Sequence, residues 1–442
     1  MKSRVELPVG DGMSCALELP PGWTVQEVLQ NQKVESIDLV EALKEGLTSP
    51  IGAASPLCRD YKDRDICIVV DDETRPTPVD AIFPRLWDFL RHSGAEPERT
   101  TVLVAAGAHA PMSCEAICRR LGVSDPEGMR LVCNDCRDED VLEDLGWTPS
   151  GMPIRINGAV VTADFVFSIG TIEPHIMAGF GGGYKNIVPG CAGLETVAAT
   201  HLLGPAMERF GNVGRHAASC PVRLRIDEAA SAAVKNCFIV NTVLDASHGI
   251  AGLFCGDPLE AHRMGCLLAE RVWGGELSAR GDVLLGSSSP MVHDLCQASK
   301  ALSMGAGALR EGGIILMVLC CRNGLGDYCV SPTARGYEEN RRIIRSYGTE
   351  YYLERKREEL GGAPLPFYES FLTQSNAEAL RKADIFVHSP DIPADELNAF
   401  GLFRAFVSVD AMLEEAAWRF PRASVVLSPH SGVCYPRLRP PA

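Results

Sequence analysis

Residues 163–201 read ADFVFSIGTIEPHIMAGFGGGYKNIVPGCAGLETVAATH, and the fold class follows from this stretch. Residues 163–169 form a short, mainly apolar run, which predicts a buried strand of a parallel sheet. The strand leads into a glycine-rich loop, and a helix follows that begins near Glu195 and ends at His201. Strand, loop and helix in this order predict an α/β fold, whose ligands bind at the carboxyl ends of the strands.

The glycine-rich loop, residues 179–183, separates His175 from Lys185. Such a loop exposes backbone N–H groups that can hold an anion, and it lets a bulky ligand lie against the main chain. On the residues alone, Lys185 is a phosphate ligand, a covalent anchor or a solvated charge. His201 either satisfies the last helix carbonyls or binds nickel, copper or zinc. One lysine with two histidines around it indicates a cofactor or a metal.

Two common nucleotide-binding loops do not match this segment. A nucleotide-phosphate loop has glycine before its lysine and Ser or Thr after it, whereas Lys185 lies between Tyr184 and Asn186. In a dinucleotide fingerprint the third glycine comes later than Gly183 does after Gly181. The loop therefore predicts a different ligand.

Composition limits the classes of partner. The 442 residues predict two or three domains, and a net charge of −15 argues against nucleic acid or an anionic membrane as a partner. No apolar run is long enough to span a bilayer, and the N-terminus lacks the apolar core of a signal peptide. The 17 cysteines indicate reduced thiols and a cytoplasmic protein. Cys133 and Cys136 form an isolated C-x-x-C pair, which does not by itself predict a zinc site.

Polar residues follow three predicted strands at the point where each strand ends. The strands are the apolar runs 65–70, 101–106 and 163–169. The polar residues that follow them are, in chain order, Asp71, Asp72 and Arg75, then His109, then His175. Because ligands of open α/β sheets bind at the carboxyl ends of the strands, we expect these side chains to line one site.

Each of these residues also has an ordinary structural interpretation. Asp71 and Asp72 can bind a metal or ligand hydroxyls, but helix capping and a local ion pair explain them equally well. Arg75 can pair with a carboxylate or a phosphate. His109 is a candidate general acid–base, although a lone loop histidine is more often only hydrogen-bonded.

A second series of strands and helices begins after residues 272–280, whose sequence VWGGELSAR is typical of a loop. We therefore predict an N-terminal α/β domain, residues 1–275, which carries the lysine and the histidines. A C-terminal Rossmann-like α/β domain follows, residues 276–442. Its mainly parallel sheet is predicted from the apolar runs 282–285, 314–320, 384–388 and 424–427.

A predicted helix over residues 291–309 carries Gln297 and Lys300 on one face. Together these side chains can hold a substrate carboxylate. Most such pairs are solvated surface residues, so the pair alone does not identify a site.

Taken together, five motifs resemble the lactate racemase family of nickel-pincer enzymes. They are DDETRPTP at 71–78, GAHAPM at 107–112, PHIMAGFGGGYKNIVPG at 174–190, His201, and QASK at 297–300. They occur in the family's order, at its approximate spacing, and the block 170–201 is the most specific. The resemblance implies two α/β domains with the active site in the cleft between them.

The resemblance also implies a cofactor, a nickel-pincer nucleotide (pyridinium-3-thioamide-5-thiocarboxylic acid mononucleotide). Lys185 matches the lysine to which this cofactor is joined beside the metal, and His201 matches the histidine that ligates nickel. The other residues that we assign to cofactor binding are Asp71, Asp72, Arg75, Gly181, Gly182 and Gly183.

The implied activity is a racemase or epimerase that inverts the hydroxyl-bearing carbon of a 2-hydroxy acid. His109 and His175 match the acid and base on opposite faces of the substrate. One histidine takes the hydroxyl proton while hydride leaves Cα for the cofactor, and the flat 2-oxo acid takes the hydride back on its other face. Arg75, Gln297 and Lys300 match residues that contact substrate or cofactor anions.

The chain departs from the lactate enzymes beside His109. Ala108 and Ala110 stand where those enzymes carry a threonine and an arginine, so a longer or bulkier 2-hydroxy acid is a candidate substrate. An aromatic residue near the substrate has only Tyr368 as a weak counterpart. The expected partner is a small 2-hydroxy acid, with no nucleic acid and no membrane, and a homo-oligomer is compatible with the sequence.

Two other functions compete with this interpretation. A zinc-dependent hydrolase would use His109, His175 and His201, but it leaves the glycine loop and Lys185 unexplained. A non-catalytic protein that stores or senses the pincer cofactor would keep the cofactor residues. Such a protein usually loses a catalytic histidine, whereas this chain has both.

Overall fold

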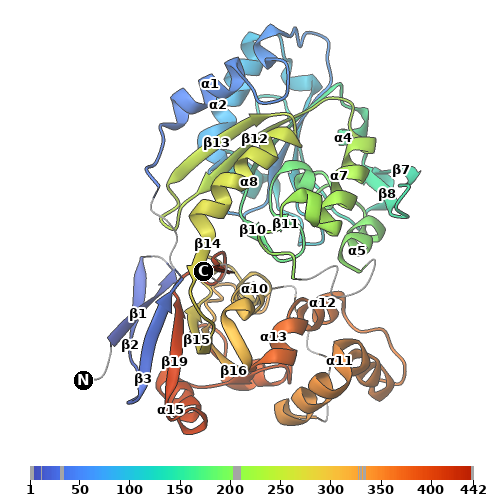
Figure 1. Cartoon of the computed structure of the whole chain (residues 1–442). Coiled ribbons are helices and arrows are strands. Elements are labelled where there is room, and N and C mark those ends of the chain that lie inside the picture. The colour runs from blue at the N-terminus through green and yellow to red at the C-terminus, as the bar shows by residue number, and fades with distance from the viewer. Residues whose placement is uncertain are drawn as a thin grey trace. The chain divides into compact units, whose positions relative to one another are not determined.

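The computed structural model describes residues 4–10, 12–29, 34–202, 211–326, 328, 331 and 335–439. The chain divides into two compact units (Figure 1). Unit 1 comprises Met1–Gln32 and Trp273–Ala442, and unit 2 comprises Lys33–Val272. Each unit contains a six-stranded sheet with helices, which confirms the predicted pair of α/β domains with mainly parallel sheets.

The sheet of unit 2 has the strand order β13-β12-β9-β4-β5-β6. Its strands are β4 (Ile66–Asp71), β5 (Thr100–Ala105), β6 (Arg130–Cys133), β9 (Phe165–Thr171), β12 (Cys237–Leu244) and β13 (Ile250–Gly256). All neighbours are parallel except the antiparallel pair of β12 and β13. Every residue of β4 is buried, as a central strand covered on both faces requires.

One face of this sheet packs against α1 (Leu39–Thr48), α2 (Val79–His92) and α3 (Cys114–Leu121) in a single hydrophobic core. Phe83, Leu86 and Leu90 of α2 are fully buried there, at the i, i+3, i+7 spacing of one helix face. The strands predicted from the three apolar runs are confirmed to within two residues.

The remaining elements of unit 2 lie outside the six-stranded sheet and are not among α1, α2 and α3. The strands are β7 (Leu142–Trp147), β8 (Pro153–Asn157), β10 (Pro174–His175) and β11 (Gly179–Phe180). The helices are α4 (Gly158–Thr162), α5 (Leu194–Leu202), α7 (Pro221–Ala233) and α8 (Glu260–Trp273). The 3-10 turns are η1 (Pro56–Cys58), η2 (Pro97–Arg99), η3 (Glu139–Val141), η4 (Gly183–Asn186) and η5 (Ala217–Ser219).

The sheet of unit 1 is parallel throughout, with the order β18-β17-β16-β15-β19-β3. Its strands are β3 (Trp23–Val28), β15 (Gly281–Ser287), β16 (Leu309–Val318), β17 (Asp384–His388), β18 (Arg404–Ala405) and β19 (Ala423–Ser428). The longer helices are α11 (Tyr337–Glu359), α12 (Phe367–Ser375), α13 (Ala377–Lys382), α14 (Ala394–Asn398) and α15 (Val409–Arg419). A separate pair is formed by β14 (Gly274–Leu277) and β20 (Tyr435–Leu438).

The N-terminal segment belongs to unit 1, whereas we predicted it as part of a domain over residues 1–275. Strands β1 (Arg4–Gly10) and β2 (Met13–Glu18) form an antiparallel pair. The next strand, β3, pairs in parallel with β19 near the C-terminus, and the two lie side by side in Figure 1. Trp23 adds a hydrogen bond of 2.7 Å from its Nε1 to the carbonyl oxygen of Phe420. The boundary at the other end, after Val272, lies close to the predicted one.

Two local predictions are wrong. Residues 272–280 are not one loop, because α8 extends to Trp273 and β14 follows directly. The single helix predicted over 291–309 is divided into α9 (Leu295–Ala298), α10 (Lys300–Met304) and the 3-10 turn η6 (Ala306–Ala308). In the part of the chain that the structure describes, we find no helix of the length and apolar character that crossing a membrane requires.

The placement of the N-terminal segment predicts a stability effect. Trp23 is 5% exposed in the core of unit 1, so Trp23→Ala should lower the free energy of unfolding by about 3–5 kcal/mol, the usual cost of truncating a buried aromatic residue. Trp418→Ala is the matched control, because Trp418 is 79% exposed in the same unit and its loss should change stability by less than about 0.5 kcal/mol. Equilibrium denaturation of both variants measures the difference, and equal effects would contradict this placement.

Candidate active site

Three parallel strands bring the predicted polar groups to one edge of the unit 2 sheet. Val70 of β4 is in register with Ile169 of β9 and with Val104 of β5. The chain therefore leaves these neighbouring strands at the same edge, and the segments with Asp72, His109 and His175 follow there. The three polar clusters therefore follow strands that end at the same edge, while a single site lined by all of them stays a prediction.

His109 is held by Asp72. Its Nδ1 lies 2.6 Å from Oδ2 of Asp72, and Oδ1 of the same carboxylate accepts hydrogen bonds from the backbone N–H and the hydroxyl of Thr74 at 3.0 and 2.5 Å. Burial raises the pKa of Asp72, but His109 and Arg75 outweigh burial and hold this pKa well below its ordinary value. The ionised carboxylate accepts the Nδ1 proton of His109, which leaves the lone pair of the neutral ring on Nε2.

The carboxylate of Asp71 is buried and hydrogen-bonded by two side chains of the protein. Its Oδ1 accepts a hydrogen bond of 2.6 Å from Nη2 of Arg120, and its Oδ2 accepts one of 2.5 Å from the hydroxyl of Thr77. Arg120 also donates to the carbonyl of Arg75 at 3.1 Å. Burial raises the pKa of Asp71, and Arg120 opposes this shift. Arg120, which sequence reasoning missed, thus fixes the turn that carries Arg75, while cofactor binding by Asp71 stays a prediction.

His175 is held in the opposite tautomer to His109. It lies opposite Gly179 in the two-stranded pair of β10 and β11. Its Nδ1 accepts hydrogen bonds of 3.2 Å from the backbone N–H groups of both Met177 and Ala178. Since these donors need a lone pair on Nδ1, the hydrogen of the neutral ring is on Nε2.

We expected the glycine loop to expose its backbone N–H groups to a ligand, but at least two of these groups are bonded within the protein. The N–H of Gly181 donates to the carbonyl of Glu173 at 2.7 Å, and that of Gly183 donates to Oδ1 of Asn241 at 2.7 Å. Glycine is required at residue 183 because φ is 60° and an added Cβ would lie 2.9 Å from Cγ of His262. Conformation and close packing therefore explain this glycine, and contact of Gly181, Gly182 and Gly183 with a cofactor stays a prediction.

Three buried polar side chains beneath the loop were missed by sequence reasoning. They are Arg223 on α7, Asn241 on β12 and His262 on α8. Nε2 of His262 donates to the carbonyl of Gly181 at 2.8 Å, and burial keeps its pKa well below the ordinary value, so the ring is neutral. Only Asn241 left a signal in the sequence, as an amide inside the apolar strand CFIVNTVL. Nothing marks Arg223 in its helix as different from a surface arginine.

Lys185 and His201 have the chemistry that the implied cofactor requires. Lys185 lies in η4, and its neighbour Asn186 donates to the carbonyl of Ile169 in β9 at 2.9 Å. His201 lies on α5 with Nδ1 2.7 Å from the carbonyl of Val197, an arrangement that puts its hydrogen on Nδ1 and its lone pair on Nε2. Metal-ligating histidines are commonly oriented in this way. An imidazole lone pair and an amine therefore fit a nickel-pincer group.

Gln297 and Lys300 interact in unit 1 although no single helix carries them. Nζ of Lys300 donates to Oε1 of Gln297 at 2.5 Å, and Gln297 is 1% exposed, so this is not a solvated surface pair. Nearby, the hydroxyl groups of Ser299 and Tyr328 lie 3.1 Å apart. The ring of Tyr368 lies edge-on to that of Tyr328, with centroids 6.0 Å apart. Substrate binding by these residues stays a prediction.

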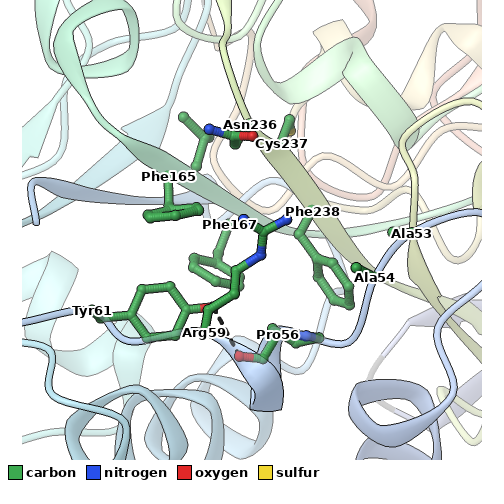
Figure 2. Close-up of a pocket in the computed structure, with 11 residues that line it drawn as sticks. Ala53, Ala54, Pro56, Arg59, Tyr61, Phe165, Phe167, Asn236, Cys237 and Phe238 are labelled. Atoms are coloured by element: carbon green, nitrogen blue, oxygen red, sulfur yellow. Dashed lines mark hydrogen bonds between the residues drawn. The ribbon is translucent and has the colours of Figure 1, made fainter.

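A separate small cavity lies at the other ends of the strands (Figure 2). Its volume is about 80 Å³, and Phe165 and Cys237, the first residues of β9 and β12, are among its lining residues. The guanidinium of Arg59 stacks on the ring of Phe165 at 5.2 Å from its centroid. This aromatic cavity is therefore distinct from the edge that carries His109 and His175.

Within the described ranges, no three His, Cys, Asp or Glu side chains gather into a group able to hold a metal ion. The zinc-hydrolase interpretation needs His109, His175 and His201 in such a group, so the arrangement of these residues does not favour it. Cys133 and Cys136 are thiols. Burial raises the pKa of Cys133 to about 11 and also raises that of Cys136.

Comparison with known sequences gives a consistent family. The profile of the lactate racemase N-terminal domain matches residues 10–210. The lactate racemase of Thermoanaerobacterium thermosaccharolyticum is 29% identical over 331 residues, which cover 73% of this chain and 76% of the relative. The lactate racemase of Lactiplantibacillus plantarum is 32% identical over 291 residues, which cover 65% of this chain and 67% of the relative.

Solved structures agree on the fold. The lactate racemase apoprotein of Thermoanaerobacterium thermosaccharolyticum superposes with a TM-score of 0.80 at 23% identity, covering 98% of this chain and 100% of the other. A Thermotoga maritima protein superposes with a TM-score of 0.67 at 18% identity, covering 92% and 100% of the two chains. With the predicted motifs at adjoining strand ends and the sequence matches to its members, this chain belongs to the lactate racemase family.

Proposed function

We propose that this protein is a racemase of lactate or of a lactate-like 2-hydroxy acid. The lactate racemases among its relatives support the reaction class. The observation that carries the proposal is the 2.6 Å contact between Nδ1 of His109 and Oδ2 of Asp72. It leaves the lone pair of His109 on Nε2, and an imidazole in this state is a suitable base for the hydroxyl of a 2-hydroxy acid.

The finer proposal is that the protein uses a nickel-pincer nucleotide, with Lys185 as its covalent anchor and His201 as a nickel ligand. When bound, this group supplies the acceptor for the hydride at Cα of the substrate. His201 would ligate through Nε2, because its Nδ1 is bound to the carbonyl of Val197. The amine of Lys185 would form the covalent attachment.

The two catalytic histidines are proposed to exchange protons with the substrate oxygen at different points of the reaction. In the tautomers described above, His109 has a lone pair on Nε2 and His175 has a hydrogen there. To take a proton at Nε2, His175 needs a lone pair there, and the hydrogen of its neutral ring must then be on Nδ1. A hydrogen on Nδ1 prevents the hydrogen bonds that this atom accepts from the backbone N–H groups of Met177 and Ala178. The proton step at His175 is therefore coupled to the turn formed by residues 177 and 178.

The substrate carboxylate is proposed to bind cationic side chains. Nη1 of Arg75 lies 3.9 Å from Oε1 of Glu173, a distance at which an incoming carboxylate competes with a long ion pair. Gln297 and Lys300 are proposed to contact the substrate or cofactor anions as well. Of the two small residues beside His109, Ala108 is buried and Ala110 is exposed, so residue 110 is the one expected to admit a bulkier substrate.

Removal of the charge on Asp72 tests the proton-transfer proposal. Asp72→Asn should lower kcat for racemisation roughly a hundredfold or more, because the Nδ1–H form of His109 loses its ionised acceptor. Asp88→Asn is the control, since Asp88 is an exposed acid on α2 with a side chain that is 66% accessible. Racemisation of a panel of chiral 2-hydroxy acids, lactate included, is followed by polarimetry. Equal kcat in the two variants would contradict the assigned role.

Removal of Lys185 tests the anchor. Intact-protein mass spectrometry of the loaded protein should show a cofactor-sized addition that disappears in Lys185→Ala, together with the activity. Lys235→Ala, which alters an exposed lysine of unit 2, should keep both. Full activity of Lys185→Ala with added cofactor would show that the covalent attachment is not needed.

Isotope labelling tests the fate of the hydrogen on Cα. If it moves as hydride and returns, deuterium placed on Cα should remain on carbon through the inversion. A histidine that removed it as a proton would exchange it with water, because imidazolium protons equilibrate rapidly with solvent. Racemisation of substrate with ordinary hydrogen on Cα, carried out in deuterated water and followed by NMR or mass spectrometry, distinguishes the two routes. Deuterium uptake at Cα that keeps pace with inversion would exclude the hydride route.

A further inference from the structure

A buried arginine beneath the glycine loop binds its backbone carbonyls. Arg223 is 1% exposed and lies in the first turn of α7. Its guanidinium donates through Nε to the carbonyl of Ala178 at 3.4 Å, through Nη1 to that of Gly182 at 3.2 Å, and through Nη2 to that of Phe180. Three carbonyls of one short loop thus depend on a single side chain. A planar fork of five N–H donors can bind carbonyls in this way, and a lysine amine cannot.

Cys220, the residue that precedes α7, binds the peptide next to the one that Arg223 holds. Cys220 is fully buried, and its Sγ lies 3.3 Å from the carbonyl oxygen of Met177. Burial raises the pKa of Cys220, so the thiol keeps its proton and donates it to this oxygen. The carbonyl of Met177 and the N–H of Ala178 belong to the same planar peptide group. Cys220 and Arg223 therefore bind the two peptide groups that meet at Ala178.

The ring of His175 depends on this short segment. Its Nδ1 accepts from the N–H groups of Met177 and Ala178, so the orientation of these peptides determines which ring nitrogen carries the hydrogen. Arg223 also shares a hydrogen-bond acceptor with the backbone of Lys185. The carbonyl of Gly182 accepts from Nη1 of Arg223 and from the backbone N–H of Lys185, at 3.2 and 3.1 Å.

Stability alone is a poor explanation for a guanidinium at this place. Among the described residues, the charged partner of Arg223 is Asp227, whose Oδ1 lies 3.6 Å from Nη1 of Arg223. Burial raises the pKa of Asp227 and Arg223 opposes the shift, as for an acid that is only partly compensated. Buried charge pairs often contribute little net stability relative to apolar residues of similar volume. An apolar residue in place of Arg223 could not make the hydrogen bonds to the backbone carbonyls.

We propose that Arg223 and Cys220 are positioning residues that fix His175 in the tautomer with its hydrogen on Nε2. Cys220 binds the Met177–Ala178 peptide, whose N–H points at Nδ1 of His175, and Arg223 holds the next peptide through the carbonyl of Ala178. The catalytic consequence rests on the proposed function, in which His175 exchanges a proton with the substrate, whereas the tautomer itself is a property of the protein alone.

The test is nitrogen-15 NMR of histidine side chains in the full-length protein without substrate, with the signals of His109 and His175 assigned from variants. In the wild type, His175 should show the Nε2–H pattern and His109 the Nδ1–H pattern. In Arg223→Lys, the His175 shifts should move toward the average of two tautomers, while His109 is unchanged because Asp72 still holds it.

Two further variants make the outcome decisive. Arg263→Lys is the control, because Arg263 is an exposed arginine on α8, and His175 should keep its wild-type pattern there. Cys220→Ala removes one small donor and should shift His175 in the same direction as Arg223→Lys, which keeps the proposal testable if the arginine variant does not fold. Folded variants with unchanged His175 signals would overturn the positioning role. If the tautomers respond as expected but the wild type racemises no 2-hydroxy acid, the proposed function fails and the positioning role stands.

Discussion

The parallel register of β9, β4 and β5 is the constraint on which the candidate site depends. Val70 pairs with both Ile169 and Val104, so the segments that continue from these strands emerge together. The pairing is specified by apolar burial, since every residue of β4 is buried, and a slip of one residue would exchange the faces of a strand. The distance between an acid and a base at the sheet edge is thus set by hydrophobic residues several positions earlier in the chain.

Two arginines near the candidate site, Arg120 and Arg223, donate hydrogen bonds to backbone carbonyls as well as pairing with acids. Arg120 binds the carboxylate of Asp71 and a carbonyl of the following turn, and Arg223 binds two carbonyls of the glycine loop and that of Ala178 just before it. Loops at ligand sites are otherwise among the least stable parts of a protein. In this protein, guanidinium groups give two such loops fixed backbone conformations, so that His109 and His175 do not need to be held by packing of their own rings.

The sequence predicted those parts of the fold that depend on local patterns. The apolar runs that become β4, β5 and β9 were found because their composition and length specify buried strands. The helix over 291–309 failed because its composition is helical, whereas the structure turns at Ser299 and Gly305. Residues 1–32 were assigned to the other domain because the partner of β3 lies nearly at the other end of the chain.

Sequence patterns predicted where the candidate residues lie relative to the strands, but they did not predict the contacts of these residues. The strand-end positions indicated His109 and Asp72, yet nothing local shows that one binds the other, since they are far apart in the chain. The glycine loop was interpreted as an anion site because its glycines are visible and the partners of its N–H groups, Glu173 and Asn241, are not. Contacts between distant segments follow from the fold, and a pattern within one segment does not contain them.

The pairing of β3 with β19 has a consequence for synthesis of the chain. Trp23 and its partner Phe420 are 397 residues apart, so ribosomes that add about 5–20 residues per second separate them by roughly 20 to 80 s. Unit 2 is complete in sequence before most of unit 1 has been translated. The first strands of the chain must therefore wait, with their apolar side chains exposed, until the last strand of their sheet emerges. During that interval β3 lacks the strand with which it pairs in the finished protein, and unpaired strand edges are prone to aggregation.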